Sequence, residues 1–292
     1  MIQGSIVALV TPFTATGEVD EVALKGLIDW HIEQGTDAIL VCGTTGESAT
    51  LSHEEHRSVI RTAVTHVNKR VPVVAGCGSN STQESLGLVR YAHETGADYA
   101  LVITPYYNKP TQEGLYRHFC AVAGETAIPV ILYNVPGRTG VNMLPETVAR
   151  VYRDCPTVVG VKEASGNIDQ VVALMSFVDD KFVLLSGEDG ATVPMMAVGC
   201  TGVISVIANI MPKETHDMVS AFLAGDIAEA KRLQLYLYEM VRMMFVETNP
   251  IPAKTALGMM GRIIPNMRLP LCELSAGNRE KLQTTLQKYK LI

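Results

Sequence analysis

Residues 157–166 read TVVGVKEASG, and the lysine in this stretch bears on both the fold and the chemistry of the chain. The run from Val158 to Val161 is apolar and β-branched, as in a strand of a parallel sheet that is covered on both faces. A lysine is uncommon in such a strand unless it is paired, reaches solvent at the strand's end, or has lost its proton. We therefore expect Lys162 near the carboxyl end of a buried strand, where it either pairs with Glu163 or reaches solvent, or acts as a reactive amine.

Similar apolar runs recur along the first three quarters of the chain. We expect strands at 4–11, 37–42, 71–77, 98–104, 129–136, 157–163, 181–187 and 199–207. The segments between these runs have helical patterning, and no G-x-G-x-x-G follows the first run, which disfavours an open dinucleotide-binding sheet. Eight strands, each followed by a helix, predict an α/β fold, a (β/α)8 TIM barrel, over residues 1–224.

Helix start signals support this alternation. Ser52 with Glu55, and Ser81 with Glu84, match capping boxes. Pro145 suits the first position of a helix, and Asn167 suits a cap.

The last quarter of the chain has no strand-like run. Segments 226–246, 251–261 and 277–290 have helical patterning, with prolines between them. We expect residues 225–292 to form a C-terminal helical region packed on the barrel.

Composition excludes several classes of function. Of the 292 residues, 47% are hydrophobic and 18% are charged, and the net charge is −6, so a nucleic-acid role is not expected. No segment reaches the roughly 20 apolar residues of a membrane span, and the amino terminus lacks the basic start of a signal peptide. The six cysteines have no C-x-x-C spacing, which predicts reduced, buried thiols. We expect a cytoplasmic protein.

Catalytic groups of a TIM barrel lie at the carboxyl ends of the strands, where several candidates fall. A lysine desolvated there loses its proton more readily, and its neutral amine can attack a carbonyl to form a Schiff base, which would explain Lys162. Tyr133 is either a core tyrosine or a proton relay. The GTTGE turn at 43–47 offers N–H groups and hydroxyls to a small carboxylate. Arg138 is either a surface ion-pair partner or a carboxylate clamp.

The sequence HEEH at 53–56 could be mistaken for a metal motif. It lacks the H-E-x-x-H spacing of a zinc site, so no metal is predicted there.

Three motifs in this order closely resemble the dihydrodipicolinate synthase family, within the pyruvate-dependent class I aldolase superfamily of N-acetylneuraminate lyase. They are GTTGE at 43–47, YNVPGRTG at 133–140 and GVKEASG at 160–166. The likeness extends from GSIVALVTPF at 4–13 through NPIPAK at 249–254 to RLPL at 268–271. It implies condensation of pyruvate with L-aspartate 4-semialdehyde to 4-hydroxy-tetrahydrodipicolinate in lysine (diaminopimelate) biosynthesis.

The resemblance also implies the catalytic residues. Lys162 would bind pyruvate covalently as an imine, so that no metal or organic cofactor is needed. Thr44, Tyr133 and Tyr107 would form a proton relay, with Tyr107 reaching in from a neighbouring subunit. The enamine of pyruvate would add to the aldehyde, and the amine of the second substrate would then displace Lys162 and cyclise.

Four further positions match substrate-binding residues of the family. Thr45 would hold the carboxylate of pyruvate, and Arg138 that of aspartate semialdehyde. Gly187 and Ile204 match backbone positions that line the pocket. Family members are usually homotetramers built as dimers of tight dimers, so we expect a homo-oligomer.

A second site is implied by members that are inhibited by lysine. Its residues match Ser48, Ala49, His53, His56, Asn80, Glu84 and Tyr106. Glu84 would pair with the α-amine of L-lysine and Tyr106 with its carboxylate, while Tyr106 adjoins Tyr107 of the relay. We therefore expect feedback inhibition by L-lysine.

Two alternatives remain open. A sugar-acid aldolase of the same superfamily, such as N-acetylneuraminate lyase, shares the lysine and tyrosine but typically lacks an arginine at the position of Arg138. A non-catalytic binding or regulatory protein on the same fold would be expected to have lost Lys162 or Tyr133, and both are present.

Overall fold

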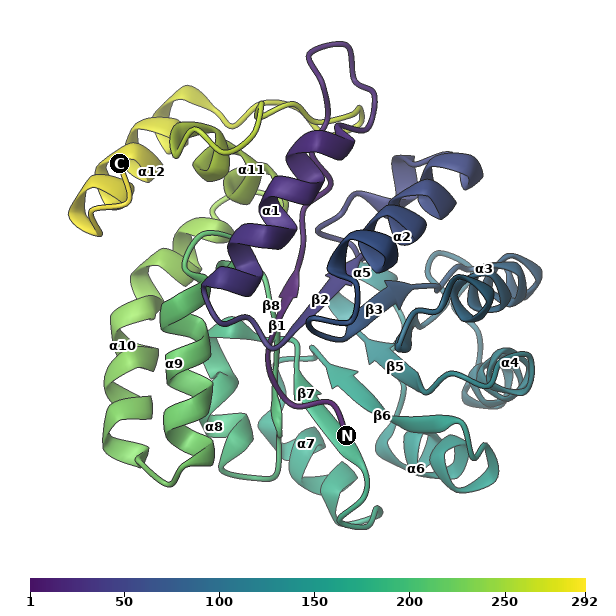
Figure 1. Cartoon of the computed structure of the whole chain (residues 1–292). Coiled ribbons are helices and arrows are strands. Elements are labelled where there is room, and N and C mark those ends of the chain that lie inside the picture. Colours follow the sequence, from purple (N-terminus) through teal and green to yellow (C-terminus); the bar gives the residue numbers. More distant parts are fainter.

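A closed barrel of eight parallel strands forms the centre of the molecule, and helices surround it (Figure 1). The computed structural model describes all of residues 1–292. The strands follow chain order and are β1 (Gly4–Ala8), β2 (Ala38–Val41), β3 (Val73–Gly76), β4 (Tyr99–Ile103), β5 (Val130–Asn134), β6 (Val158–Glu163), β7 (Val183–Ser186) and β8 (Gly202–Ser205). Pairing of β8 with β1 closes the barrel. The predicted (β/α)8 TIM barrel is thus confirmed.

Helices follow each strand, and further helices follow the last one. The α-helices are α1 (Glu21–Glu33), α2 (His53–Val67), α3 (Thr82–Thr95), α4 (Gln112–Gly124), α5 (Pro136–Thr139), α6 (Pro145–Asp154), α7 (Ile168–Met175), α8 (Thr192–Met196), α9 (Pro212–Leu223), α10 (Ile227–Met244), α11 (Ile251–Met259) and α12 (Ala276–Lys288). Three 3₁₀ turns are η1 (Ser48–Thr50), η2 (Asp189–Ala191) and η3 (Ile207–Asn209).

The helices begin at the predicted residues, and one predicted side-chain hydrogen bond, that of the Glu84 carboxylate, is absent. Ser52 and Glu55 form a reciprocal capping box at the start of α2. Ser81 accepts a hydrogen bond from the N–H of Glu84, but the Glu84 carboxylate binds the Ser79 hydroxyl and does not return to the cap. The second predicted capping box therefore has only one of its two hydrogen bonds. The return bond from the Glu84 carboxylate to the backbone of Ser81 is absent, because the Ser79 hydroxyl binds that carboxylate instead.

All eight strands are shorter than the runs predicted for them, and side-chain contacts account for the carboxyl ends of β1 and β8. Beyond β1 the backbone N–H of Val10 donates to the Asn209 side chain at 3.0 Å. Beyond β8 the Asp189 carboxylate accepts the N–H groups of Val206 and Ile207 at 2.9 and 3.0 Å and holds the chain in η3. After β1 and after β8, a side chain accepts the backbone N–H groups that a neighbouring strand would otherwise bind. The chain therefore leaves the sheet there, although the residues that follow are still apolar and buried.

Side chains of the strands alternate between two apolar clusters. The inner cluster fills the barrel with residues such as Ile6, Leu40 and Ile131. The outer cluster lies between strands and helices and includes Val7 and Leu132. Because successive residues of a strand point to opposite faces, this alternation fixes which polar residues face the interior.

The C-terminal helices lie beside the barrel, with α12 in yellow at the edge of the molecule (Figure 1). Leu282 and Leu286 of α12 belong to the same outer cluster as Leu24 of α1. The division into a barrel over residues 1–224 and a C-terminal region over residues 225–292 remains a proposal.

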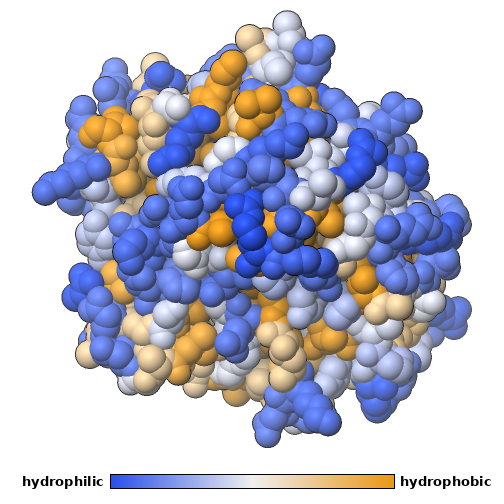
Figure 2. All heavy atoms as spheres, viewed as in Figure 1, coloured by the Kyte–Doolittle hydropathy of each residue, from blue (hydrophilic) through white to orange (hydrophobic).

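No helix is both long and apolar enough to cross a bilayer. Figure 2 shows one face, on which apolar patches alternate with hydrophilic side chains.

Candidate active site

Lys162 and Tyr133 lie side by side at the carboxyl ends of β6 and β5. The two residues are partners in the register of these strands. The amine of Lys162 is 4.2 Å from the centre of the Tyr133 ring. Both residues are buried, with 6% and 7% of their surface exposed. The sheet thus brings an amine and a phenol together at the end of the barrel where this fold places its chemistry.

Glu163 does not pair with Lys162. As the next residue of β6 it points to the opposite face, where its carboxylate accepts hydrogen bonds from the Asn134 side chain at 3.0 Å and from the Ser165 N–H at 2.7 Å. No carboxylate of the chain forms an ion pair with Lys162. The interpretation of Lys162 as half of an ion pair with Glu163 is therefore wrong, because a strand alternates its side chains.

The absence of a side chain at Gly187 leaves space for the Lys162 side chain. A Cβ at Gly187 would lie 2.6 Å from the Cβ of Ala164 and 3.0 Å from the Cε of Lys162. Ile204, on β8, is buried in the inner cluster. Both residues predicted to line the pocket thus lie at the barrel's interior, one directly against the lysine.

The GTTGE segment forms a tight turn after β2. The N–H of Gly46 donates to the carbonyl of Gly43 at 3.0 Å, and the N–H of Glu47 donates to the carbonyl of Thr44 at 3.1 Å. Glu47 has a φ of 52°, a conformation that is uncommon for a residue other than glycine. The turn therefore needs support from outside itself.

Asn249 supplies part of this support and was not among the predicted site residues. Its side-chain N–H donates to the Thr45 hydroxyl at 2.9 Å, and its backbone carbonyl accepts from Arg138 at 3.3 Å. Because the Thr45 oxygen is the acceptor, its own hydrogen remains available to a ligand. The Oδ1 atom of Asn249 is buried and has no hydrogen-bond partner.

A buried ion pair supplies the rest of the support. The ammonium of Lys254 lies 2.6 Å from the Glu47 carboxylate, and the two side chains are 0% and 1% exposed. Burial lowers the pKa of Lys254 to about 8, against the opposing effect of Glu47. The other carboxylate oxygen of Glu47 accepts the Arg268 N–H at 3.2 Å. The motif at 249–254 was noticed in the sequence, but only the fold shows that it holds the turn.

One cavity of about 580 Å³ collects nine of the fifteen predicted site residues. They are Thr44, Ser48, Ala49, His53, His56, Glu84, Tyr106, Tyr133 and Arg138. The other six, Thr45, Asn80, Tyr107, Lys162, Gly187 and Ile204, are outside its lining. Lys162 is nevertheless in contact with Tyr133, which is part of the lining.

The side chains proposed for a second ligand form one wall of this cavity. The Nε2 atom of His56 is 2.8 Å from the carbonyl of Gly76, so this nitrogen carries the hydrogen. Burial lowers the pKa of His56, which favours the neutral ring. His53 is exposed and lies 3.5 Å from Glu84. No group of three or more His, Cys, Asp or Glu side chains is arranged to hold a metal ion.

Tyr107 and Asn80 each adjoin a residue that lines the cavity, Tyr106 and Ser79, but are not part of the lining themselves. The Tyr107 side chain is 89% exposed, and its φ of 72° lies in the left-handed region. The backbone carbonyl of Asn80 accepts from Asn108 at 2.9 Å. Neither residue lines the cavity of about 580 Å³, so the role of Tyr107 in the relay and that of Asn80 in the L-lysine site stay predictions.

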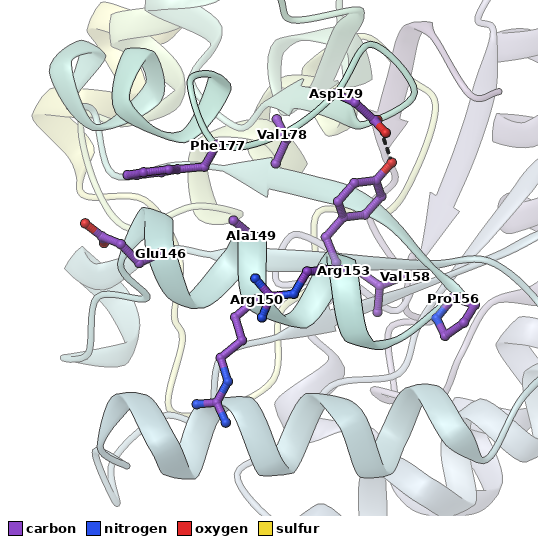
Figure 3. Close-up of a pocket in the computed structure, with 10 residues that line it drawn as sticks. Glu146, Ala149, Arg150, Arg153, Pro156, Val158, Phe177, Val178 and Asp179 are labelled. Atoms are coloured by element: carbon purple, nitrogen blue, oxygen red, sulfur yellow. Dashed lines mark hydrogen bonds between the residues drawn. The ribbon is translucent and has the colours of Figure 1, made fainter.

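A second pocket of about 730 Å³ lies at the opposite end of β6 (Figure 3). Arg150, Arg153, Phe177 and Asp179 are among its lining residues, and Tyr152 donates to Asp179 at 2.8 Å. Its position beside Val158, the first residue of β6, separates it from Lys162 at the other end of the strand. We assign no chemistry to it.

The chain is similar to known proteins over its whole length. A family model described as the dihydrodipicolinate synthetase family matches residues 1–289. The 4-hydroxy-tetrahydrodipicolinate synthase of Geobacter sulfurreducens is 55% identical over 100% of both chains. That of Nitratidesulfovibrio vulgaris is 56% identical over 97% of both.

Solved structures agree with these relatives. The dihydrodipicolinate synthase of Aquifex aeolicus has a TM-score of 0.98 and 49% identity, with 99% of each chain covered. A chloride-inhibited enzyme from Acinetobacter baumannii in complex with pyruvate has a TM-score of 0.97 and 46% identity over 100% of both chains. An enzyme from Cyanidioschyzon merolae with lysine bound has a TM-score of 0.96 and 39% identity, with 99% of each covered.

Proposed function

Because the chain belongs to the dihydrodipicolinate synthetase family and is an enzyme of the lyase class, we propose that it condenses pyruvate with L-aspartate 4-semialdehyde to 4-hydroxy-tetrahydrodipicolinate. The observation that carries this proposal is the amine of Lys162, buried without a carboxylate partner and 4.2 Å from the Tyr133 ring. The complex of a 46% identical enzyme with pyruvate supports the first substrate.

Lys162 is the nucleophile of the proposed reaction. Its neutral amine attacks the keto carbon of pyruvate, and loss of water leaves an imine that withdraws electrons from the neighbouring methyl group. Loss of a proton from that methyl group gives an enamine, whose carbon adds to the aldehyde of the second substrate. The amine of that substrate then displaces Lys162 by transimination and closes the ring.

The hydroxyls near Lys162 move the protons in this scheme. The Lys162 amine lies over the Tyr133 ring, and Thr44 lines the same cavity as Tyr133. Tyr107, exposed in one chain, completes the relay from a neighbouring subunit of a homo-oligomer, which we propose is a tetramer of two tight dimers. A relay of this kind is worth about 10²–10⁴-fold in rate.

Two side chains bind the substrate carboxylates. Thr45 donates its free hydroxyl hydrogen to the carboxylate of pyruvate, because its oxygen is occupied by Asn249. Arg138 lines the cavity and binds the carboxylate of aspartate semialdehyde. An arginine here favours a short substrate with its own carboxylate over the sugar acids of related aldolases.

L-Lysine is the proposed inhibitor. Ser48, Ala49, His53, Glu84 and Tyr106 line the cavity that also contains the catalytic hydroxyls, so a ligand there has a short route to the reaction. The relative with lysine bound supports this ligand. If Tyr106→Phe leaves inhibition by L-lysine unchanged, the proposed route through Tyr106 is wrong.

Borohydride trapping tests the central claim. The protein is incubated with pyruvate, reduced and digested, and the modified peptide is identified by mass spectrometry. We expect the reduced pyruvate adduct on Lys162 and none on Lys254, a second buried lysine whose amine is engaged by Glu47. An unmodified Lys162 in the folded protein, or an equal adduct on Lys254, would contradict the proposal.

Substrate assays then separate the two enzyme classes. We expect pyruvate to be consumed with L-aspartate 4-semialdehyde and no cleavage of N-acetylneuraminate or 2-keto-3-deoxy sugar acids. Arg138→Lys should raise the KM for the semialdehyde more than that for pyruvate, since lysine cannot bind a carboxylate through two parallel hydrogen bonds. Cleavage of a sugar acid as the faster reaction would favour the aldolase.

A further inference from the structure

Two cysteines on the outer helical layer lie unusually close together. Cys120 belongs to α4, and Cys155 is the residue that ends α6. Their sulfur atoms are 2.6 Å apart, although the residues are separated by 35 positions in sequence. Non-bonded heavy atoms prefer about 3.5–4.0 Å, whereas a disulfide requires about 2.0 Å. Both residues are free thiols.

We propose that Cys120 and Cys155 form a redox site, which reacts with a peroxide and closes into an intramolecular disulfide. This site is separate from the proposed catalytic centre. No other two cysteine sulfurs of the chain form a hydrogen bond with each other. The juxtaposition is therefore particular to this pair.

Contacts between the two helices hold the thiols in place. Arg150 extends from α6 (Figure 3), forms an ion pair with Glu113 of α4 at 2.7 Å and lies 3.5 Å from the centre of the Tyr116 ring. The Tyr116 hydroxyl donates to Asp154 at 3.1 Å. Tyr116 lies about one helical turn before Cys120, and Asp154 directly precedes Cys155, so the sulfurs need little movement to bond.

The two thiols differ in exposure and in hydrogen bonding. Cys120 is partly exposed, while Cys155 is buried. Cys155 donates its S–H to the Cys120 sulfur. Burial raises the pKa of Cys155 to about 12, with contributions from Cys120 and Asp154. Cys120 is thus the thiol that a small oxidant reaches, and Cys155 is the one that resolves the product.

The chemistry balances with hydrogen peroxide as the oxidant. The Cys120 sulfur attacks one peroxide oxygen, the O–O bond breaks, and a sulfenic acid and one water form. The Cys155 sulfur then attacks the Cys120 sulfur; an S–S bond forms, the S–O bond breaks, and the hydroxide leaves as a second water with the proton of Cys155. Two thiols lose two electrons, and one peroxide is reduced to two waters.

Closure of this bond would stabilise the fold. It would connect α4 to the end of α6 and restrict a 35-residue loop in the unfolded chain. For a chain of this size we expect the melting temperature to rise by about 5 °C.

Mass spectrometry of the full chain tests the proposal without relying on a variant. The reduced protein is treated with one equivalent of hydrogen peroxide, unfolded, alkylated and digested without reductant. We expect a linked peptide that contains Cys120 and Cys155, an intact mass lower by two hydrogen atoms, and reversal by dithiothreitol. Quantitative alkylation of both cysteines after this treatment, or a sulfinic acid on Cys120 without a link, would overturn the proposal.

Variants supply the controls. Cys272→Ser removes the exposed cysteine, which would otherwise link two chains, and should leave the internal link unchanged. In that background the oxidised protein should melt at a higher temperature than the reduced protein, and Cys120→Ser should abolish both the link and the difference. A difference in melting temperature that persists in Cys120→Ser would assign the effect to another residue.

Discussion

The buried ion pair between Lys254 and Glu47 allows a quantitative prediction. Lys254→Met removes the ammonium and keeps a side chain of similar length. The Glu47 carboxylate, 1% exposed, would then have only the Arg268 N–H as a donor. Removing one partner of a buried pair typically costs about 3–5 kcal/mol, because the other charge stays buried and uncompensated. The pair joins residues 207 positions apart, so the loss should also loosen the turn that presents Thr45.

Urea unfolding measures this cost. We expect the midpoint to fall with an unchanged dependence on urea concentration and the KM for pyruvate to rise. The double variant Glu47→Gln with Lys254→Met should be more stable than Lys254→Met alone, since it buries no charge. The matched control is Lys213→Met, which removes the same group from an exposed ion pair with Asp217 and should cost about 1 kcal/mol or less. Equal costs for Lys254→Met and Lys213→Met would refute the reasoning.

Two further predictions concern the pocket and the response to acid. Gly187→Ala places a Cβ 3.0 Å from the Cε of Lys162 and should lower kcat/KM by about 10-fold or more. In the control Gly137→Ala, the added Cβ has no atom within 4 Å, and kcat/KM should stay unchanged. Equal effects of the two substitutions would contradict the steric argument. The hydrogen bond from Arg268 lowers the pKa of Glu55 to about 2 from 4.5, so the stabilisation is present above pH 4.5 and is lost as the pH falls toward 2. Between about pH 5.5 and about pH 3.5, the wild-type protein should lose about 1 kcal/mol more of its free energy of unfolding than Glu55→Gln does; parallel losses in urea unfolding would exclude this role.

The sequence alone determined the architecture. Each of the eight strands lies within a run of apolar residues, since a strand covered on both faces must be apolar on consecutive positions. The lysine at the end of one such run was recognisable as chemically significant because a charge there is costly. Its neighbour Tyr133 could be expected nearby because consecutive strands of a barrel are adjacent.

Tertiary structure alone decided how these residues are held and what accompanies them. The contacts of Asn249 with Thr45 and of Lys254 with Glu47 join residues more than 200 positions apart, and no local periodicity encodes such pairs. Local patterns predict backbone conformation because neighbouring residues restrict it. The meeting of two distant side chains depends instead on how helices and strands pack around one core.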